Sequence, residues 1–332
     1  MRKFVDNIRR SLKGLARRNP KLRRAYHRLR GRLHQARLTT GTAHRTDGVS
    51  PENIVWIFGS GRSGSTWLRS MMAEMKHHRV WEEPMVGRLF GDFHARAQGG
   101  NLLSSDFIMG DPIRRGWIQS IRTFVLDGIR LSHPRLTPNE YLIVKEPNGS
   151  TGAPLLMQAL PESRMILLVR DPRDAVASSL DGAKGESWLH EWRGGDQPNR
   201  QNLADERPDR FVRRRADSYR RHMTKAREAY EAHRGRKTLV RYEDLRTDTP
   251  GTMTRIYSEL GIFVQEKDLA QAVERHSWER LPESEKGAGK FYRKGAPGGW
   301  RDDLTPEQAR TVEEITGPLL RKFYPEDPAP RA

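Results

Sequence analysis

The chain contains no cysteine among its 332 residues. This absence excludes a disulfide framework, thiolate metal sites and thiol catalysis, and nothing in the sequence requires an oxidising compartment. Long hydrophobic runs are also missing, since the longest aliphatic stretch, residues 165–169, is far shorter than the roughly 20 residues of a membrane-spanning helix. No apolar segment follows the basic start of the chain, so we expect a cytoplasmic protein that is soluble or peripheral to a membrane.

Positive charge is concentrated at one end of the chain. The net charge is +18, and residues 1–46 hold +14 of it, with 15 Lys or Arg and a single acid. The other 286 residues are nearly neutral at +4. This distribution disfavours a nucleic-acid-binding body that is basic throughout. It indicates a near-neutral domain with a cationic extension.

We call residues 1–46 the basic arm. Their apolar residues follow helical spacing with a break at residues 19–20, which predicts two basic amphipathic helices. The apolar faces of these helices could pack on the body or on a second subunit. Alternatively, residues 1–38 could dock on an anionic membrane surface or an anionic acceptor. Nucleic acid is the least favoured partner, because only Phe4 and Tyr26 could stack on bases.

Beyond the arm, residues 39–51 form a linker of Thr, Gly and Ser, residues 51–324 form the main domain, and residues 325–332 form a Pro-rich tail. Short apolar runs predict strands at residues 54–58, 141–144, 165–169 and 238–241. Helices are predicted near residues 65, 154 and 172, and over residues 208–233 and 305–323. Strands that alternate with helices predict an α/β, three-layer fold with a central parallel sheet. Residues 183–207, which are polar and irregular, should cross one end of that sheet.

A turn rich in Gly and Ser follows the first strand and precedes a helix. Glycines let backbone N–H groups surround an anion, and the helix N-terminus adds the positive end of its dipole. Compared with the nucleotide-triphosphate loop G-x-x-x-x-G-K-[ST], the turn has Gly59, Gly64 and Thr66, but Ser65 replaces the lysine. We therefore predict a P-loop-like fold that binds phosphate, with Arg62 as the cation inside the turn. The missing lysine disfavours a nucleotide kinase.

These residues resemble the sulfotransferases that use 3′-phosphoadenosine 5′-phosphosulfate (PAPS), most closely the carbohydrate and tyrosylprotein types. The family's 5′-phosphosulfate loop is similar to Gly61, Arg62, Ser63, Gly64, Ser65, Thr66 and Trp67. Its 3′-phosphate element, an Arg followed eight residues later by a Ser, is similar to Arg170 and Ser178. Tyr242 lies in a stretch that resembles the element near the adenine. The resemblance implies that these residues bind PAPS, and Trp67 is either an adenine-stacking or a core residue.

A further family element, R-K-G-x-x-G-x-W, resembles residues 293–300, although Gly299 stands where the family often has Asp. The resemblance implies that Arg293, Lys294 and Gly295 bind the cofactor as well. Two phosphate-bearing positions on one nucleotide need two cationic sites, and this cluster with Arg170 supplies the second one.

The family resemblance implies transfer of a sulfuryl group from PAPS to a hydroxyl, without a metal. Such a transfer needs in-line positioning and cations at the leaving oxygen. Arg62 stands where many relatives have lysine, and Lys145 resembles the family lysine that contacts the sulfuryl group. The histidine base of soluble relatives is replaced by Pro147. Glu83, within a stretch similar to the family's Glu-Pro element, is the favoured base, and Glu146 is its rival.

The acceptor and the oligomeric state are left open by the sequence. A sugar, a glycolipid or another small alcohol would suit a glutamate base. Trp81, Phe90, Trp188 and Trp192 could stack on sugar rings or fill the core. A non-catalytic anion- or membrane-binding protein on a degenerate P-loop scaffold is the main alternative, and a nucleotide kinase is a weaker one. His77 and His78 are expected on the surface at a helix end.

Overall fold

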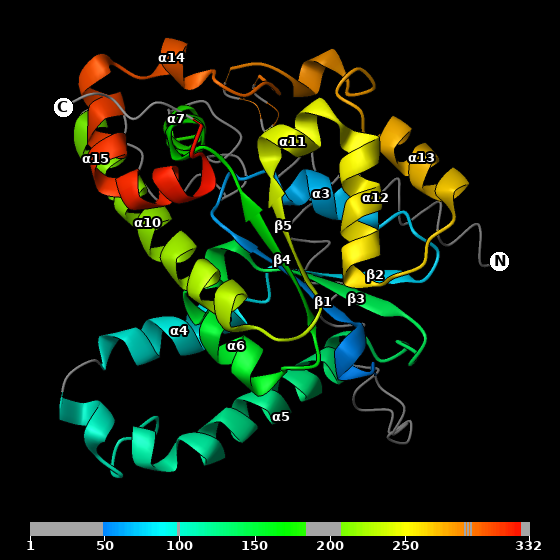
Figure 1. Cartoon of the computed structure of the whole chain (residues 1–332), viewed down its shortest axis with the longest axis vertical. Helices are drawn as coiled ribbons and strands as arrows, with labels where there is room; N and C mark the ends of the chain where they lie inside the picture. The colour runs from blue at the N-terminus through cyan, green and yellow to red at the C-terminus, as the bar shows by residue number, and fades with distance from the viewer. Residues whose placement is uncertain are drawn as a thin grey trace, which may run out of the picture.

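A five-stranded parallel sheet organises the residues that the computed structural model describes, which are residues 49–326 apart from 98–99, 184–206, 289, 291 and 293 (Figure 1). The strand order is β2-β3-β1-β4-β5, and every neighbouring pair is parallel. The strands are β1 (Ile54–Gly59), β2 (His78–Glu82), β3 (Tyr141–Lys145), β4 (Arg164–Val169) and β5 (Lys237–Arg241). The basic arm, Trp188, Trp192, Arg293 and residues 327–332 lie outside the described residues.

Helices cover both faces of the sheet. Their bounds are α3 (Ser65–Met72), α4 (Val86–Arg96), α5 (Arg114–Ser132), α6 (Ala153–Ala159), α7 (Pro172–Asp181), α10 (Pro208–Ala232), α11 (Tyr242–Thr247), α12 (Thr249–Leu260), α13 (Glu266–Arg275), α14 (Trp300–Asp303) and α15 (Pro306–Phe323). The short 3₁₀ helices are η1 (Pro51–Asn53), η2 (Gly100–Leu103), η3 (Asp111–Ile113), η4 (Pro147–Gly152) and η5 (Glu283–Glu285). The predicted α/β architecture with a central parallel sheet is thus confirmed.

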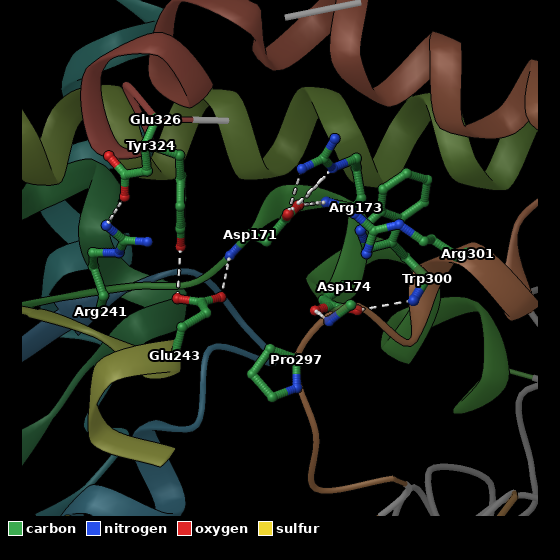
Figure 2. A pocket seen from close by; sticks show the side chains of 11 residues that line it. Asp171, Arg173, Asp174, Arg241, Glu243, Pro297, Trp300, Arg301, Tyr324 and Glu326 are labelled. Atoms are coloured by element: carbon green, nitrogen blue, oxygen red, sulfur yellow. Dashed lines mark hydrogen bonds and ion pairs between the residues drawn. The ribbon is translucent and has the colours of Figure 1, made fainter. Parts of the chain in front are cut away.

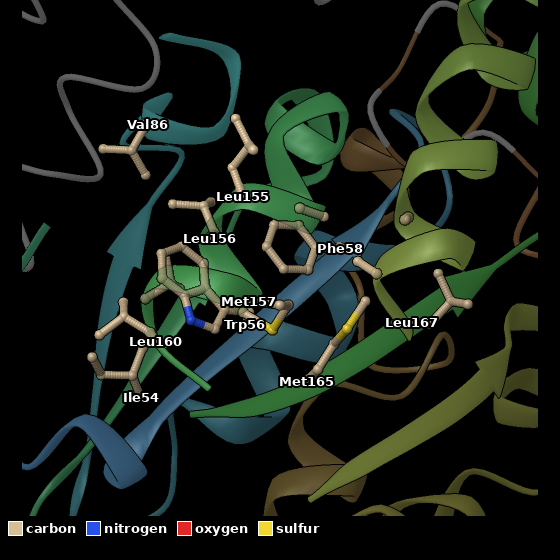
Figure 3. Close-up of a cluster of buried hydrophobic side chains, with 14 of the residues drawn as sticks. Ile54, Trp56, Phe58, Val86, Leu155, Leu156, Met157, Leu160, Met165 and Leu167 are labelled. Carbon is tan, nitrogen blue, oxygen red and sulfur yellow. The ribbon is translucent and has the colours of Figure 1, made fainter. Parts of the chain in front are cut away.

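Strand β1 explains why the fold has three layers. All six of its residues are buried, as expected for a central parallel strand with helices on both faces. Trp56 and Phe58 point to one side, where they stack at 5.5 Å and pack with residues of α6 such as Leu156 (Figure 3). Val55 and Ile57 point to the other side, into a cluster with residues of α3 and α12. The two clusters together anchor the strand end that carries the loop.

Strand β2 is the main element that the apolar pattern misses, because charged residues interrupt it. The expectation that His78 lies on the surface at a helix end is wrong, since His78 begins β2 and is 5% exposed. Its ring lies 5.4 Å from that of Tyr141, and burial lowers the pKa of His78 to about 4. With β2 at the edge next to β3, Glu82 comes into register with Lys145.

Helices α4 and α5, with η2 and η3 between them, extend away from the sheet beyond α6 (Figure 1). Among the described residues, seven of the eight exposed large hydrophobic side chains belong to this lobe: Leu89, Phe93, Leu103, Ile108, Ile113, Phe124 and Leu131. Trp81 and Phe90 are only half-exposed and pack against the core. No helix of the described residues is long and apolar enough to span a bilayer.

Candidate active site

The carboxyl ends of the strands meet at one edge of the sheet, where ligands of open α/β sheets bind. There the glycine-rich loop links β1 to α3. Arg62 and Gly64 have φ angles of 71° and 89°, and Gly64 is the N-cap of α3. A Cβ on Gly64 would lie 2.5 Å from Cδ2 of Tyr242. Glycine is therefore required at position 64 both by the left-handed backbone and by the ring of Tyr242.

Two buried polar atoms beside this loop indicate an anionic ligand. Ser63 is 1% exposed, and its Oγ has no hydrogen-bond partner among the described residues. The Nε of Arg170 is likewise buried without such a partner in the described part of the chain. Buried polar groups are normally satisfied, because leaving one unpaired costs about 1–3 kcal/mol. A hydroxyl and a guanidinium N–H at a helix N-terminus would be satisfied by phosphate oxygens.

The structure brings together three elements that resemble cofactor-binding motifs: the glycine-rich loop, the segment from Arg170 to Ser178, and Tyr242. Nη1 of Arg170 donates to the carbonyl oxygen of Arg62 at 3.0 Å, and Nε of Arg62 donates to Oγ of Ser178 at 3.0 Å. The guanidinium of Arg170 also lies 4.3 Å from the centre of the Tyr242 ring. These residues, predicted from separate motifs, therefore surround one position between the loop and α7.

Aromatic side chains lie at the far end of this position. The rings of Trp67 and Tyr242 meet edge to face at 6.1 Å, and Nε1 of Trp67 donates to the carbonyl oxygen of His276 at 2.8 Å. The guanidinium of Arg246 lies 6.0 Å from the ring of Trp67 and 5.9 Å from that of Trp278. The sequence analysis misses Trp278, because a single tryptophan after α13 belongs to no motif. Because both indoles lie near the guanidinium of Arg246, Trp278 adds a second indole to this region.

The loop before α14 carries two of the residues that the resemblance assigns to cofactor binding, Lys294 and Gly295. The carbonyl oxygen of Gly295 accepts a hydrogen bond from Arg246, which holds this glycine beside the aromatic cluster. Lys294, in contrast, forms ion pairs at 3.0 Å with Asp302 and 3.1 Å with Asp303. Buried Asp174 of α7 accepts backbone N–H groups of the same loop at 2.7 and 2.9 Å. Asp174 thus holds the loop against α7, while the ammonium of Lys294 is paired with the two aspartates of α14.

A cleft of about 390 Å³ begins at Asp171, the residue after Arg170, and lies between the start of α7 and the ends of β5 and α15 (Figure 2). Glu243 joins its walls, because one carboxylate oxygen accepts the N–H of Asp171 at 3.0 Å and the other accepts the hydroxyl of Tyr324 at 2.9 Å. Tyr219 of α10 donates its hydroxyl to the carbonyl oxygen of Arg170 at 2.5 Å. Burial raises the pKa of Glu243. These contacts fix the peptide group that joins Arg170 to Asp171.

On the other side of the loop, Lys145 forms ion pairs with two carboxylates. Its Nζ lies 2.6 Å from Oε1 of Glu82 and 2.8 Å from Oε1 of Glu83, and it donates to Oγ1 of Thr66 at 3.1 Å. Glu82 is also paired with Arg69 at 2.8 Å. A hydroxyl of the phosphate loop, a buried lysine and Glu83 are therefore in direct contact.

Glu83 and its rival Glu146 occupy different environments. Glu146 is fully buried and accepts the N–H groups of Met85 at 3.0 Å and Gly87 at 3.2 Å. Burial raises the pKa of Glu146 to about 7. Glu83, whose side chain is 25% exposed, accepts Nδ2 of Asn148 at 2.8 Å on its second oxygen. Glu83 and Met85 both have positive φ angles, 44° and 64°, so Glu146 holds a strained turn in which Glu83 is the accessible carboxylate.

The fold and this site together define an α/β enzyme with a phosphate-binding loop and a carboxylate–lysine pair beside it. The sequence model of the sulfotransferase family matches residues 55–266, which is more than half of the chain. The chain therefore belongs to the sulfotransferase family, and transfer of a sulfuryl group is its general activity.

Solved structures support the same fold. Sulfotransferase STF9 from Mycobacterium avium is similar with a TM-score of 0.52 at 16% identity, over 83% of this chain and 78% of that one. Mouse sulfotransferase SULT7A1, complexed with PAP, is similar with a TM-score of 0.50 at 16% identity, over 82% of this chain and 86% of that one. No curated protein matches the sequence. The prediction of a P-loop-like sulfotransferase is confirmed, over the kinase and the non-catalytic scaffold.

Proposed function

We propose that this sulfotransferase uses PAPS as its donor and forms a sulfate ester on a hydroxyl acceptor, with Glu83 as the general base. The observation that carries the proposal is the contact of Lys145 with both Glu83 and Thr66. It joins a partly exposed carboxylate to the loop that would bind the donor.

The donor is supported by the chemistry of the residues on the other side of the loop. Backbone N–H groups of residues 61–66 and the hydroxyl of Ser63 suit a 5′-phosphate, while Arg170 and Ser178 suit a 3′-phosphate. Trp67 and Trp278 offer faces on which a base can stack. The mouse relative of similar fold is complexed with PAP, which is the product that PAPS leaves. PAPS would supply a sulfuryl group on a phosphate that leaves readily.

In the proposed reaction, Glu83 takes the proton of the acceptor hydroxyl while that oxygen bonds to sulfur and the bond from sulfur to the 5′-phosphate oxygen breaks. Lys145 and Arg62 stabilise the negative charge that builds on the phosphate as PAP leaves. Arg62 is always protonated and so acts through its charge and not as an acid. Asn148 holds the second oxygen of Glu83 and fixes the direction of the carboxylate.

The acceptor that we favour carries a hydroxyl next to an apolar portion, as a glycolipid does. Helix α4 begins three residues after Glu83, and its Leu89 and Phe93 are half-exposed on one face of the lobe. Apolar side chains exposed next to a polar site favour a ligand with both characters. A simple sugar or a small alcohol would use Glu83 but not this surface.

The donor is tested by thermal denaturation of the full chain with PAP and, separately, with ATP. We expect stabilisation by PAP, because only PAP carries both phosphates that the two cationic positions suit. Stabilisation by ATP alone, or by neither nucleotide, would contradict the proposal. Incubation with labelled PAPS and a panel of sugars, glycolipids and simple alcohols, followed by mass spectrometry, then identifies the ester formed.

A further inference from the structure

Arg215 brings a further cation to the phosphate loop, beside Arg62, Lys145 and Arg170, from a helix that none of the sequence motifs includes. A Cβ placed on Gly61 would lie 3.5 Å from Nη2 of Arg215 and 3.2 Å from Oδ1 of Asn148. Gly61 is the residue before Arg62, so the guanidinium of Arg215, on α10, approaches the loop backbone next to Arg62. The added Cβ would be in ordinary contact with Arg215 and slightly too close to Asn148, so both side chains lie against that turn.

Helix α10 holds Arg215 in this position through its buried face. Tyr219 lies one turn further on, is 2% exposed and donates its hydroxyl to the carbonyl oxygen of Arg170. Residues i and i+4 of a helix share one face, so Arg215 projects from the same side as Tyr219. Met223, another turn along, is fully buried in the main core. The backbone that carries Arg215 is therefore fixed relative to both β4 and the loop.

Arg62 and Lys145, two of the other cations at the loop, contact groups away from Gly61. The Nε of Arg62 donates to Ser178 on the side of α7, and Lys145 is shared between Glu82 and Glu83. A sulfuryl group moving from the loop toward Glu83 carries negative charge on its outer oxygens. A cation on the acceptor side of the loop would stabilise that charge without neutralising the base.

Asn148 shows that Arg215 lies on this acceptor side. Its Nδ2 donates to Glu83 at 2.8 Å, while its Oδ1 lies by the same point of Gly61 that Nη2 of Arg215 approaches. Glu83, Asn148 and Arg215 thus follow one another around the mouth of the loop. We infer that Arg215 is a further catalytic residue, which donates hydrogen bonds to the oxygens of the sulfuryl group during its transfer.

This inference rests on the proposed donor, and its test uses the difference between PAPS and PAP. PAP lacks the sulfuryl group, so an arginine that contacts that group should contribute to binding of PAPS and not of PAP. We expect Arg215→Ala in the full chain to weaken PAPS binding, measured by calorimetry without acceptor, by about tenfold, as for a hydrogen bond to a charged group. PAP affinity should stay within about twofold of wild type, and kcat should fall by about 10²-fold, as for other donors to developing charge.

Arg213→Ala is the matched control, because Arg213 is exposed on the same helix and should leave PAPS affinity, PAP affinity and kcat unchanged. Arg215→Gln keeps most of the side-chain packing and replaces the alanine variant if that variant does not fold. Equal losses of PAPS and PAP affinity, unchanged PAPS affinity, or a rise in acceptor KM alone would overturn the inference. If the wild-type chain binds neither nucleotide, the proposed donor itself fails, which is a different result from any of these.

Discussion

The donor half and the acceptor half of the site are built by different means. On the donor side, backbone N–H groups, glycine and the helix N-terminus form the binding surface, and Ser63 and Arg170 keep buried polar atoms without partners in the described structure. On the acceptor side, side chains pair with one another around Lys145, and a strained turn holds Glu83. In the proposed site, an anion would satisfy the unpartnered polar atoms of the donor half, while the charged side chains of the acceptor half already pair with one another. Substitutions should therefore affect donor binding in the first half and turnover in the second.

Replacing the base should have the largest effect. Glu83→Gln removes the proton acceptor but keeps the size of the side chain, so we expect kcat to fall by about 10²- to 10⁴-fold. PAP affinity, measured by calorimetry, should change little. Glu82→Gln is the matched control, because Glu82 contacts the same lysine but is also held by Arg69. An equal loss of kcat in both variants would mean that the charge around Lys145, and not proton transfer, carries the effect.

A methyl group in the loop should damage the donor half. In Gly64→Ala the Cβ would lie 2.5 Å from Tyr242 in a backbone with φ of 89°, so the loop or the ring must move. The left-handed conformation alone costs about 1–2 kcal/mol, and we expect PAP affinity to fall by at least about tenfold. Gly287→Ala is the control, because Gly287 also has a positive φ but has nothing within 4 Å of the added Cβ. Normal PAP binding by Gly64→Ala would show that the loop does not need the approach of Tyr242.

Replacing Glu146, the buried carboxylate of the acceptor half, should change the free energy of unfolding and have little effect on base catalysis. The pKa of Glu146 is raised from 4.5 to about 7 by burial, so the folded state binds a proton more tightly than the unfolded state. Its contribution to stability is therefore present below pH 4.5 and is lost as pH rises to about 7, by up to about 3 kcal/mol. Glu146→Gln should flatten the decline in the free energy of unfolding between these pH values.

Denaturant titrations across this pH range measure that change, with Glu140→Gln as a control at another buried carboxylate. The kcat of Glu146→Gln should fall far less than that of Glu83→Gln, because Glu146 holds the turn and does not reach the acceptor. A kcat loss equal to that of Glu83→Gln would contradict the assignment of Glu83 alone as the base and of Glu146 as a residue that only holds the turn.

The difference between the donor half and the acceptor half also explains which parts of the proposed site could be predicted from the sequence. Gly64, Arg62 and Arg170 could be predicted because a loop that binds phosphate through its backbone needs fixed residue types at fixed spacing. Four of the five strands were predictable for a related reason, since buried parallel strands are continuously apolar.

On the acceptor side, the family resemblance names Lys145, Glu83 and Glu146, but the contacts between the residues of this half could not be predicted. The contact of Glu82 with Lys145 joins residues 63 apart, and it depends on β2, whose charged residues hide its periodicity. The burial of Glu146 and the approach of Arg215 to Gly61 likewise arise from packing between separate segments. Sequence spacing within any one of those segments carries no sign of them.

The basic arm should have the smallest effect on both halves. Deleting residues 1–46 removes +14 of the +18 net charge but none of the residues that resemble the family's motifs. We expect PAP affinity to stay within about twofold, while sedimentation with anionic lipid vesicles should decrease, because each Lys or Arg near such a surface contributes about 1 kcal/mol. Deleting residues 327–332 serves as the control for truncation. A truncated chain with a normal circular dichroism spectrum but without PAP binding would mean that the arm belongs to the donor half, and that its charge completes a site that the body alone does not form.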